Sequence, residues 1–276
     1  MRWSVRKGDV EYCRYQVCAD CGHETRRRKI ILSCPRQCCC EQPLESTVTP
    51  QAGSCYNKWT SSPERAKIGG SGMLDYERGL WEQGYTSIAG VDEVGRGCLF
   101  GDVVAAAVIL PKGLIIEDIN DSKKLSEKKR EQLFEEITAQ ALCIGVGIVD
   151  VPTIERINIK QASRLAMKQA VDQLSVPPDY LLVDAEKVDV PIRQLAVIHG
   201  DALSQSIAAA SIIAKVTRDR MCRQWDDEYP GYGIALHKGY ATKLHRERIV
   251  ELGPSPLHRK TFLGKILYEQ QDLFEL

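Results

Sequence analysis

Two kinds of hydrophobic pattern alternate along the chain after residue 72. Short runs rich in valine, isoleucine and leucine alternate with longer segments in which apolar residues recur every three or four positions. The first kind is typical of buried strands, and the second is typical of helices with one buried face. The pattern predicts strands at about 86–94, 103–110, 142–149, 180–184 and 195–199. It predicts helices at about 126–140, 152–174, 202–227 and 242–252.

This succession of strands and helices predicts an α/β fold in which helices cover one central sheet. The longest apolar run, Val103–Leu110, is far shorter than the roughly 20 residues of a membrane-spanning helix. The charged beginning of the chain lacks the apolar segment of a signal peptide. We therefore expect a cytoplasmic protein with no membrane partner, and a monomer as the default state.

The first 72 residues have a different composition. Eight of the 11 cysteines lie within the first 55 residues, and positions 41–72 are rich in Pro, Ser, Thr and Gly without apolar periodicity. Two pairs have a spacing close to that of a zinc ribbon, which would hold Zn²⁺ by four thiolates: Cys18 with Cys21, and Cys34 with Cys38. Two alternatives stay open: a disordered extension, or a start assigned too far upstream, since Met73 is a suitable first residue for the domain that follows.

Charge divides unevenly along the chain, although the formal net charge is zero. Residues 1–72 hold 12 Lys and Arg against 7 Asp and Glu, and the remainder is mildly acidic. A nucleic acid would therefore have to bind at local basic clusters, such as residues 123–130 or 237–248. The alternative for each cluster is an ordinary solvated helix face.

Four acids stand out by their positions. Asp92 and Glu93 are adjacent within a predicted buried strand, where side chains alternate and a carboxylate needs a cation or several donors. Asp184 ends an apolar run, and Asp201 takes the N-cap position of the predicted long helix. The alternative for Asp184 is an ordinary strand end, and for Asp201 an ordinary helix cap.

Glycines flank an arginine directly after the acid pair, in Gly95-Arg96-Gly97. Glycine lets the backbone approach another molecule closely, and a guanidinium offers a fork for phosphate or carboxylate. Further along, Arg218 and Asp219 are expected to form a structural ion pair or lie at the surface. The tripeptide is by itself a weak signal.

Taken together, these segments resemble the ribonuclease HII (type 2 ribonuclease H) family over about Met73–Phe262. The resemblance is carried by the acid pair with Gly95-Arg96-Gly97 and by Asp102–Leu110, Asp121–Lys129, Leu181–Ala185, Gly200–Ser211, Ala214–Asp219 and His237–Lys243. Phe100 and Asp102 depart from the family's pattern at positions that are not catalytic. The resemblance implies the ribonuclease H fold, with a mixed five-stranded sheet flanked by helices and a helical C-terminal portion.

The resemblance also implies a function. The acids Asp92, Glu93, Asp184 and Asp201 would bind two Mg²⁺ or Mn²⁺ ions that hydrolyse a phosphodiester without a protein nucleophile. The substrates would be RNA–DNA hybrids and duplex DNA with embedded ribonucleotides, met in DNA replication and repair. The implied substrate contacts are the backbone of Gly95, Arg96 and Gly97 at the 2′-hydroxyl, Tyr240 at the next sugar, and Lys123, Lys124, Ser204 and Ser206 at phosphates.

Two other functions stay open. One is a different carboxylate nuclease of the same fold, such as an integrase or a resolvase. The other is a zinc-dependent nucleic-acid-binding protein with an inactive nuclease-like remainder. Gly95-Arg96-Gly97 with Tyr240 argues against the first, and the presence of all four acids argues against the second.

The end of the chain resembles the short peptide by which replication and repair proteins hold a sliding clamp. In Gln270–Phe274, Leu273 and Phe274 would fill an apolar pocket while Gln270 bonds at its rim. The alternative is that both apolar residues cap the protein's own last helix. The sequence thus predicts three parts: an extension at 1–72, a catalytic domain at 73–262 and a tail at 263–276.

Overall fold

The computed structural model describes residues 72–264 and 266. Its centre is a five-stranded sheet in the order β3-β2-β1-β4-β5. The strands are β1 Ile88–Val94, β2 Val103–Ile109, β3 Cys143–Val149, β4 Tyr180–Asp184 and β5 Arg193–Val197. β1 pairs antiparallel with β2 and parallel with β4, so the sheet is mixed. The mixed five-stranded sheet implied by the resemblance is confirmed.

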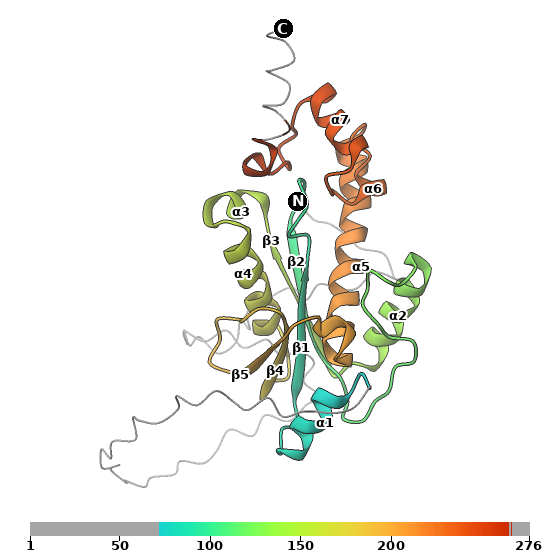
Figure 1. The fold of residues 1–276 in the computed structure, drawn as a ribbon, viewed down its shortest axis with the longest axis vertical. Helices are drawn as coiled ribbons and strands as arrows, with labels where there is room; N and C mark the ends of the chain where they lie inside the picture. The colour runs from blue at the N-terminus through green and yellow to red at the C-terminus, as the bar shows by residue number, and fades with distance from the viewer. Residues whose placement is uncertain (1–71, 265, 267–276) are drawn as a thin grey trace, which may run out of the picture. The chain divides into compact units, whose positions relative to one another are not determined.

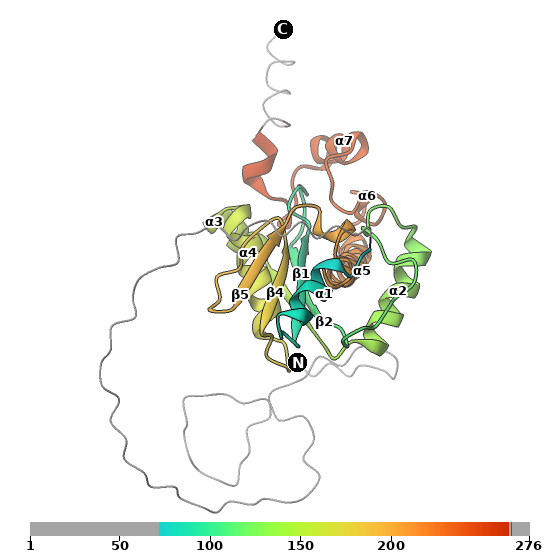
Figure 2. The ribbon, with the colours of Figure 1, turned by 60° about the horizontal axis from the view of Figure 1, so that its bottom comes forward.

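Helices cover both faces of this sheet (Figure 1, Figure 2). They are α1 Asp75–Glu82, α2 Glu127–Gln140, α3 Val151–Ile157, α4 Ile159–Asp172, α5 Gln205–Glu228, α6 Ile234–His237 and α7 Lys243–Leu252, with a short 3₁₀ helix η1 at Gly200–Ala202. α4 packs on one face, and α5 with α2 packs on the other. α6 and α7 form the expected helical C-terminal portion.

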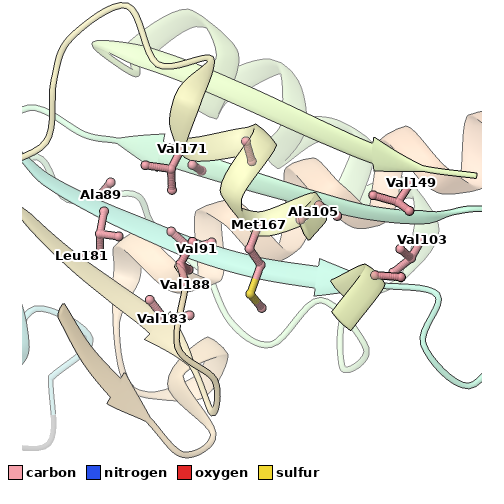
Figure 3. Close-up of a cluster of buried hydrophobic side chains, with 14 of the residues drawn as sticks. Ala89, Val91, Val103, Ala105, Val149, Met167, Val171, Leu181, Val183 and Val188 are labelled. Atoms are coloured by element: carbon pink, nitrogen blue, oxygen red, sulfur yellow. The ribbon is translucent and has the colours of Figure 1, made fainter. Parts of the chain in front are cut away.

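In the core beneath α4, alternate residues of the strands pack against one face of the helix. Figure 3 shows Met167 and Val171 of α4 above Ala89 and Val91 of β1. The intervening residues of β1 point to the other face, toward α5. A Cβ at Gly90 would lie 2.0 Å from the carbonyl oxygen of Ser206. Only glycine at this position lets α5 rest so closely on the central strand.

The structure corrects the predicted helix at 152–174, which is two helices. Asn158 has a φ of 66°, and its side chain accepts hydrogen bonds from the backbone N–H groups of Lys160 and Gln161 at the start of α4. The positive φ interrupts the helical backbone, and asparagine makes a good N-cap, so α3 ends and α4 begins there.

The start of the long helix is also corrected. The N-cap of α5 is Ser204, whose hydroxyl accepts from the backbone N–H of Ile207. Asp201 lies earlier, in η1, and the prediction that it caps the long helix is wrong. The short helices α1 and α6 were not predicted, and β5 begins two residues earlier than expected. No helix among residues 72–264 is long and apolar enough to cross a membrane.

Candidate active site

The topology brings the four predicted acids toward one end of the sheet. β1 and β4 are parallel neighbours with Val91 opposite Val183, so Asp92 and Asp184 follow at the same level. Both point toward the α5 face, because they alternate with residues of the core under α4. Asp201 lies in η1, which begins three residues after β5 ends. Two strands and the segment before α5 thus supply the cluster.

Asp92 is only 5% exposed. One carboxylate oxygen accepts a hydrogen bond of 2.7 Å from the backbone N–H of Glu93. Burial, followed by the charges of Glu93 and Asp184, raises the pKa of Asp92 well above its ordinary value, and Ser211 of α5 offsets this in part. The ionised form of Asp92 is therefore destabilised at this position by the loss of water and by the neighbouring negative charges.

Glu93 points to the opposite face of β1 and has an arginine partner. Its Oε1 lies 3.1 Å from Nη1 of Arg96. Burial raises the pKa of Glu93 to about 7, although Arg96 acts to lower it. The other oxygen, Oε2, is buried without a hydrogen-bond partner among the described residues. An orphaned carboxylate oxygen of this kind is suited to a cation.

Asp184 and Asp201 complete the cluster. Oδ1 of Asp184 accepts 2.8 Å from the backbone N–H of Gly200, which ties the end of β4 to η1. Burial, with the charges of Asp121 and Asp184, raises the pKa of Asp201. Lys123 opposes that shift, with its Nζ 3.8 Å from Oδ2 of Asp201. Burial disfavours the charge of Lys123, but Asp201 and the other acids outweigh it and raise the lysine pKa.

The donor set fits Mg²⁺ or Mn²⁺, since these ions prefer carboxylate oxygens. Within residues 72–264, no three His, Cys, Asp or Glu side chains stand close enough together to form a ready-made metal site. The fit rests instead on the unpartnered Oε2 of Glu93 and on the raised pKa of Asp92, which is due first to burial and then to the charges of Glu93 and Asp184. A divalent cation would give Oε2 of Glu93 a partner and would offset the burial of the Asp92 carboxylate and its repulsion by neighbouring acids.

The Gly95–Gly97 loop lies beside Tyr240, 143 positions later than Gly97. Cys98 and Tyr240 form an isolated antiparallel bridge, and the backbone N–H of Leu99 donates 2.8 Å to the carbonyl of Gly239. Tyr240 is 37% exposed, and burial of its remainder beside Cys98 raises its pKa to about 12. The structure therefore brings together the loop and the aromatic that the sequence singled out.

The predicted phosphate contacts divide into two pairs. Lys123 and Lys124 are exposed, and Lys123 reaches the acid cluster. Ser204 and Ser206 are buried, so the expectation that they contact phosphate is not supported. The Ser204 hydroxyl donates 2.6 Å to Glu77 of α1, and the same carboxylate accepts from the backbone N–H of Ser206. These serines anchor the start of α5 instead.

Several residues at the site were not found from the sequence. Glu186, two residues after Asp184, contacts Nη2 of Arg96 at 3.6 Å and Arg164 of α4 at 2.9 Å. Asp121 contributes to the field at Asp201. Both lie in loops without apolar periodicity, so nothing in the hydrophobic pattern marks them. The expected ion pair between Arg218 and Asp219 is wrong: Asp219 pairs with Lys215 at 2.7 Å.

Phe100 and Asp102 are the two residues that depart from the family pattern. Phe100 is fully buried and packs edge-on against Trp225 and His258. Burial, with the charge of Asp150, raises the pKa of Asp102 to about 6. The three cysteines of the domain, Cys98, Cys143 and Cys222, are buried free thiols.

Two further sets of predicted residues lie outside the part of the chain that the structure describes. They are the four zinc ligands of the extension, Cys18, Cys21, Cys34 and Cys38, and the three clamp-binding residues of the tail, Gln270, Leu273 and Phe274. The zinc ribbon and the clamp-binding peptide therefore stay predictions.

Fold and site together define a nuclease-like protein of the ribonuclease H class. A family model described as Ribonuclease HII matches residues 89–267. The chain is 62% identical over 200 residues to a ribonuclease HII of Alkaliphilus metalliredigens (strain QYMF), an alignment that covers 70% of this chain and 98% of that protein. The chain belongs to the ribonuclease HII family, and its activity is that of a ribonuclease H.

Solved structures agree with this assignment. The ribonuclease H2 of Pyrococcus horikoshii OT3 is 26% identical, with a TM-score of 0.56 over 65% of this chain and 96% of that one. A structure described as the PCNA:RNase HII complex from Archaeoglobus fulgidus is 27% identical, with a TM-score of 0.52 over 63% of this chain and 94% of that one.

Proposed function

We propose that this protein hydrolyses the phosphodiester on the 5′ side of ribonucleotides, both in RNA–DNA hybrids and as single ribonucleotides in duplex DNA. The products are 3′-hydroxyl and 5′-phosphate ends, and the role is removal of ribonucleotides from DNA in the cytoplasm. The main support for the proposal is the backbone pairing of Cys98 with Tyr240, which brings the exposed ring of Tyr240 to the Gly95–Gly97 loop that directly follows Asp92 and Glu93.

The carboxylates Asp92, Glu93, Asp184 and Asp201 would hold two Mg²⁺ or Mn²⁺ ions. When bound, the ions supply a hydroxide for in-line attack and stabilise the leaving 3′-oxygen. The protein's part is to hold these acids ready, although burial raises the pKa values of Asp92, Glu93 and Asp201. Arg96 keeps one oxygen of Glu93 in place while the other is free. Lys123 limits the negative charge around Asp201.

Recognition of the ribonucleotide would fall to the Gly95–Gly97 backbone, because the 2′-hydroxyl is what distinguishes RNA from DNA. A Cβ built on Gly97 meets no protein atom within 4 Å. Packing therefore does not require glycine at this position, which supports the view that the space is kept for substrate. Tyr240 would stack on the next sugar, and Lys123 and Lys124 would contact phosphates.

The proposal is tested with three labelled duplexes of one sequence: all DNA, DNA with one ribonucleotide, and a continuous RNA–DNA hybrid. We expect cleavage of the second and third in the presence of Mg²⁺ or Mn²⁺, and none after chelation. Asp184→Asn should abolish both activities, while Asp172→Asn, at an exposed acid that pairs with Lys168, should abolish neither. Cleavage of the all-DNA duplex would instead favour another carboxylate nuclease of this fold.

We also propose that the tail binds a replication sliding clamp through Gln270, Leu273 and Phe274. The support is the peptide pattern together with the similarity to the chain in the PCNA:RNase HII complex. The contact would be small and transient, since only two apolar side chains anchor it.

A further inference from the structure

Arg218 and Arg259 are the two largest fully buried side chains of the domain, each with 0% exposure. A buried guanidinium is costly unless its donors are all engaged. Among the described residues, neither arginine lies within salt-bridge distance of an acid, whereas other arginines of α5, such as Arg220, do. Apart from a 3.7 Å contact of Arg218 with Sγ of Cys222, their partners are backbone carbonyls, so both arginines hold the chain in its local shape.

Arg218 of α5 joins two loops. Its Nε donates 3.0 Å to the carbonyl of Asp102, and its Nη2 donates 2.9 Å to that of Phe100. Its Nη1 donates 2.8 Å to the carbonyl of Lys238. The first two carbonyls belong to the loop between β1 and β2, and the third belongs to the turn that carries Tyr240. The planar guanidinium of Arg218 thus links the β1–β2 loop to the turn that carries Tyr240.

Arg259, in the segment after α7, binds the same loop from another side. Its Nε and Nη2 donate to the carbonyl of Gly101 at 2.9 and 2.7 Å. Its Nη1 donates 3.1 Å to the carbonyl of Arg96, inside the Gly95–Gly97 segment. The backbone N–H of Arg259 also donates 2.8 Å to the carbonyl of Leu99. Burial lowers the pKa of Arg259 to about 10, which leaves it charged at neutral pH.

The fit around Arg218 is close. Gly95 has a φ of +95°, and a Cβ there would lie 2.4 Å from Nε of Arg218. A Cβ on Gly239 would lie 2.9 Å from the carbonyl oxygen of Phe100. Glycine at position 95 therefore leaves room for the guanidinium of Arg218, and glycine at position 239 lets its turn pack directly against the backbone of Phe100. Lysine cannot replace this geometry, because an ammonium lacks the rigid fork of donors.

We propose that Arg218 and Arg259 are positioning residues for ribonucleotide recognition, which fix the distance between the Gly95–Gly97 backbone and Tyr240. This rests on the proposed function of that loop and that tyrosine. The arginines touch neither the substrate nor the carboxylates. They set where the 2′-hydroxyl reader and the stacking ring stand relative to each other, so they matter most where one ribonucleotide is the only feature to be read.

The test compares Arg218→Lys and Arg259→Lys with Arg220→Lys, a control on the same helix whose guanidinium contacts Glu131 at the surface. For each folded variant, kcat and KM are measured on a duplex with one ribonucleotide and on a continuous hybrid, below the melting temperature. Displacing a substrate-positioning group by about 1 Å can cost about a hundredfold. We expect losses of about 10- to 100-fold in kcat/KM on the single ribonucleotide and a smaller loss on the hybrid.

Mn²⁺ affinity, measured by calorimetry, should stay unchanged in both variants, because the carboxylates are not touched. Gly239→Ala tests the same loop spacing with both arginines in place, and it applies even where an arginine variant fails to fold. It should produce the same difference between substrates. Equal losses on both substrates, or a wild-type ratio in Gly239→Ala, would overturn the inference alone. A wild-type protein that ignores ribonucleotides would overturn the proposed function and the inference with it.

Discussion

Asp92 and Asp184 stand at the same end of two adjacent parallel strands, each one residue beyond the Val91–Val183 pair. Their charges interact, and the interaction adds to burial in raising the pKa of Asp92. The fold therefore holds two like charges together at a cost to its own stability. The proposed metal site offers a reason, because a cation between them would convert that repulsion into binding.

Replacing Asp92 with Asn should reduce metal-dependent cleavage by at least about a hundredfold, because a lost ligand removes roughly several kcal/mol of transition-state stabilisation. The metal-free variant should melt at a higher temperature than the wild type, since a buried charge and its repulsion are gone. Single-turnover cleavage and thermal unfolding check the two effects. An Asp92→Asn protein that nicks at the wild-type rate in Mg²⁺ would refute the metal-ligand assignment.

The stability of the metal-free protein should fall as pH rises from about 4.5 to 7 on account of Glu93. Its folded pKa of about 7 lies above the ordinary 4.5, so the folded state binds the proton more tightly than the unfolded chain. The contribution is full below about pH 4.5 and is lost as pH approaches 7. The difference between its folded and ordinary pKa corresponds to about 3 kcal/mol of unfolding free energy.

Glu93→Gln isolates this effect, because His245 and His258, whose pKa burial lowers to about 4, change stability in the opposite direction over part of the same range. The difference in unfolding free energy between wild type and variant should therefore depend on pH, and saturating Mg²⁺ should reverse its sign near pH 7. A difference that is constant from pH 4.5 to 7 would rule out the buried carboxyl as its source.

The sequence pointed to the candidate carboxylates but not to the residues that support the loops around them. Asp92 and Glu93 were visible because charge inside an apolar strand is costly, and the periodicity predicted every strand. Arg218 and Arg259 were not found, since arginine is usually exposed and only the fold brings their carbonyl partners together. Asp201 was wrongly placed at the cap of α5, because Ser204, three residues later, takes that role.

Replacing Tyr240 with Ala should weaken cleavage at a single ribonucleotide more than cleavage of a continuous hybrid. Stacking by one aromatic is worth roughly 1–3 kcal/mol, and it matters most where no neighbouring ribonucleotide can substitute. Tyr240→Phe keeps the ring and should behave like the wild type on both substrates. Equal losses on both duplexes for Tyr240→Ala would mean that this residue is structural.

A protein that begins at Met73 should retain full activity, because every residue with a proposed chemical role in cleavage lies after that position. The truncated and full chains are compared by the same nicking assay and by metal analysis. Stoichiometric zinc in the full chain, lost on truncation and on replacing Cys34 and Cys38 with Ser, would establish a zinc ribbon. A folded but inactive truncated protein would disprove the expectation that residues 1–72 are dispensable.

The tail should bind a sliding clamp as an isolated peptide. A peptide spanning Leu267–Leu276 is titrated with purified bacterial clamp, alongside the same peptide with Leu273→Ala and Phe274→Ala. We expect saturable binding by the first and at least a tenfold weaker affinity for the second, because the two apolar side chains supply the anchor. The same affinity for both peptides, or none for either, excludes this partner.

The position and end groups of the cut distinguish the proposed reaction from other ways of cleaving the strand. A duplex with one ribonucleotide, labelled on the strand that carries it, is cleaved in Mg²⁺ and its products are compared with synthetic markers. We predict one cut on the 5′ side of the ribonucleotide, a 3′-hydroxyl on the upstream fragment, a 5′-phosphate on the downstream one, and no product with Asp184→Asn. A cut on the 3′ side, or a 2′,3′-cyclic phosphate end, would contradict it.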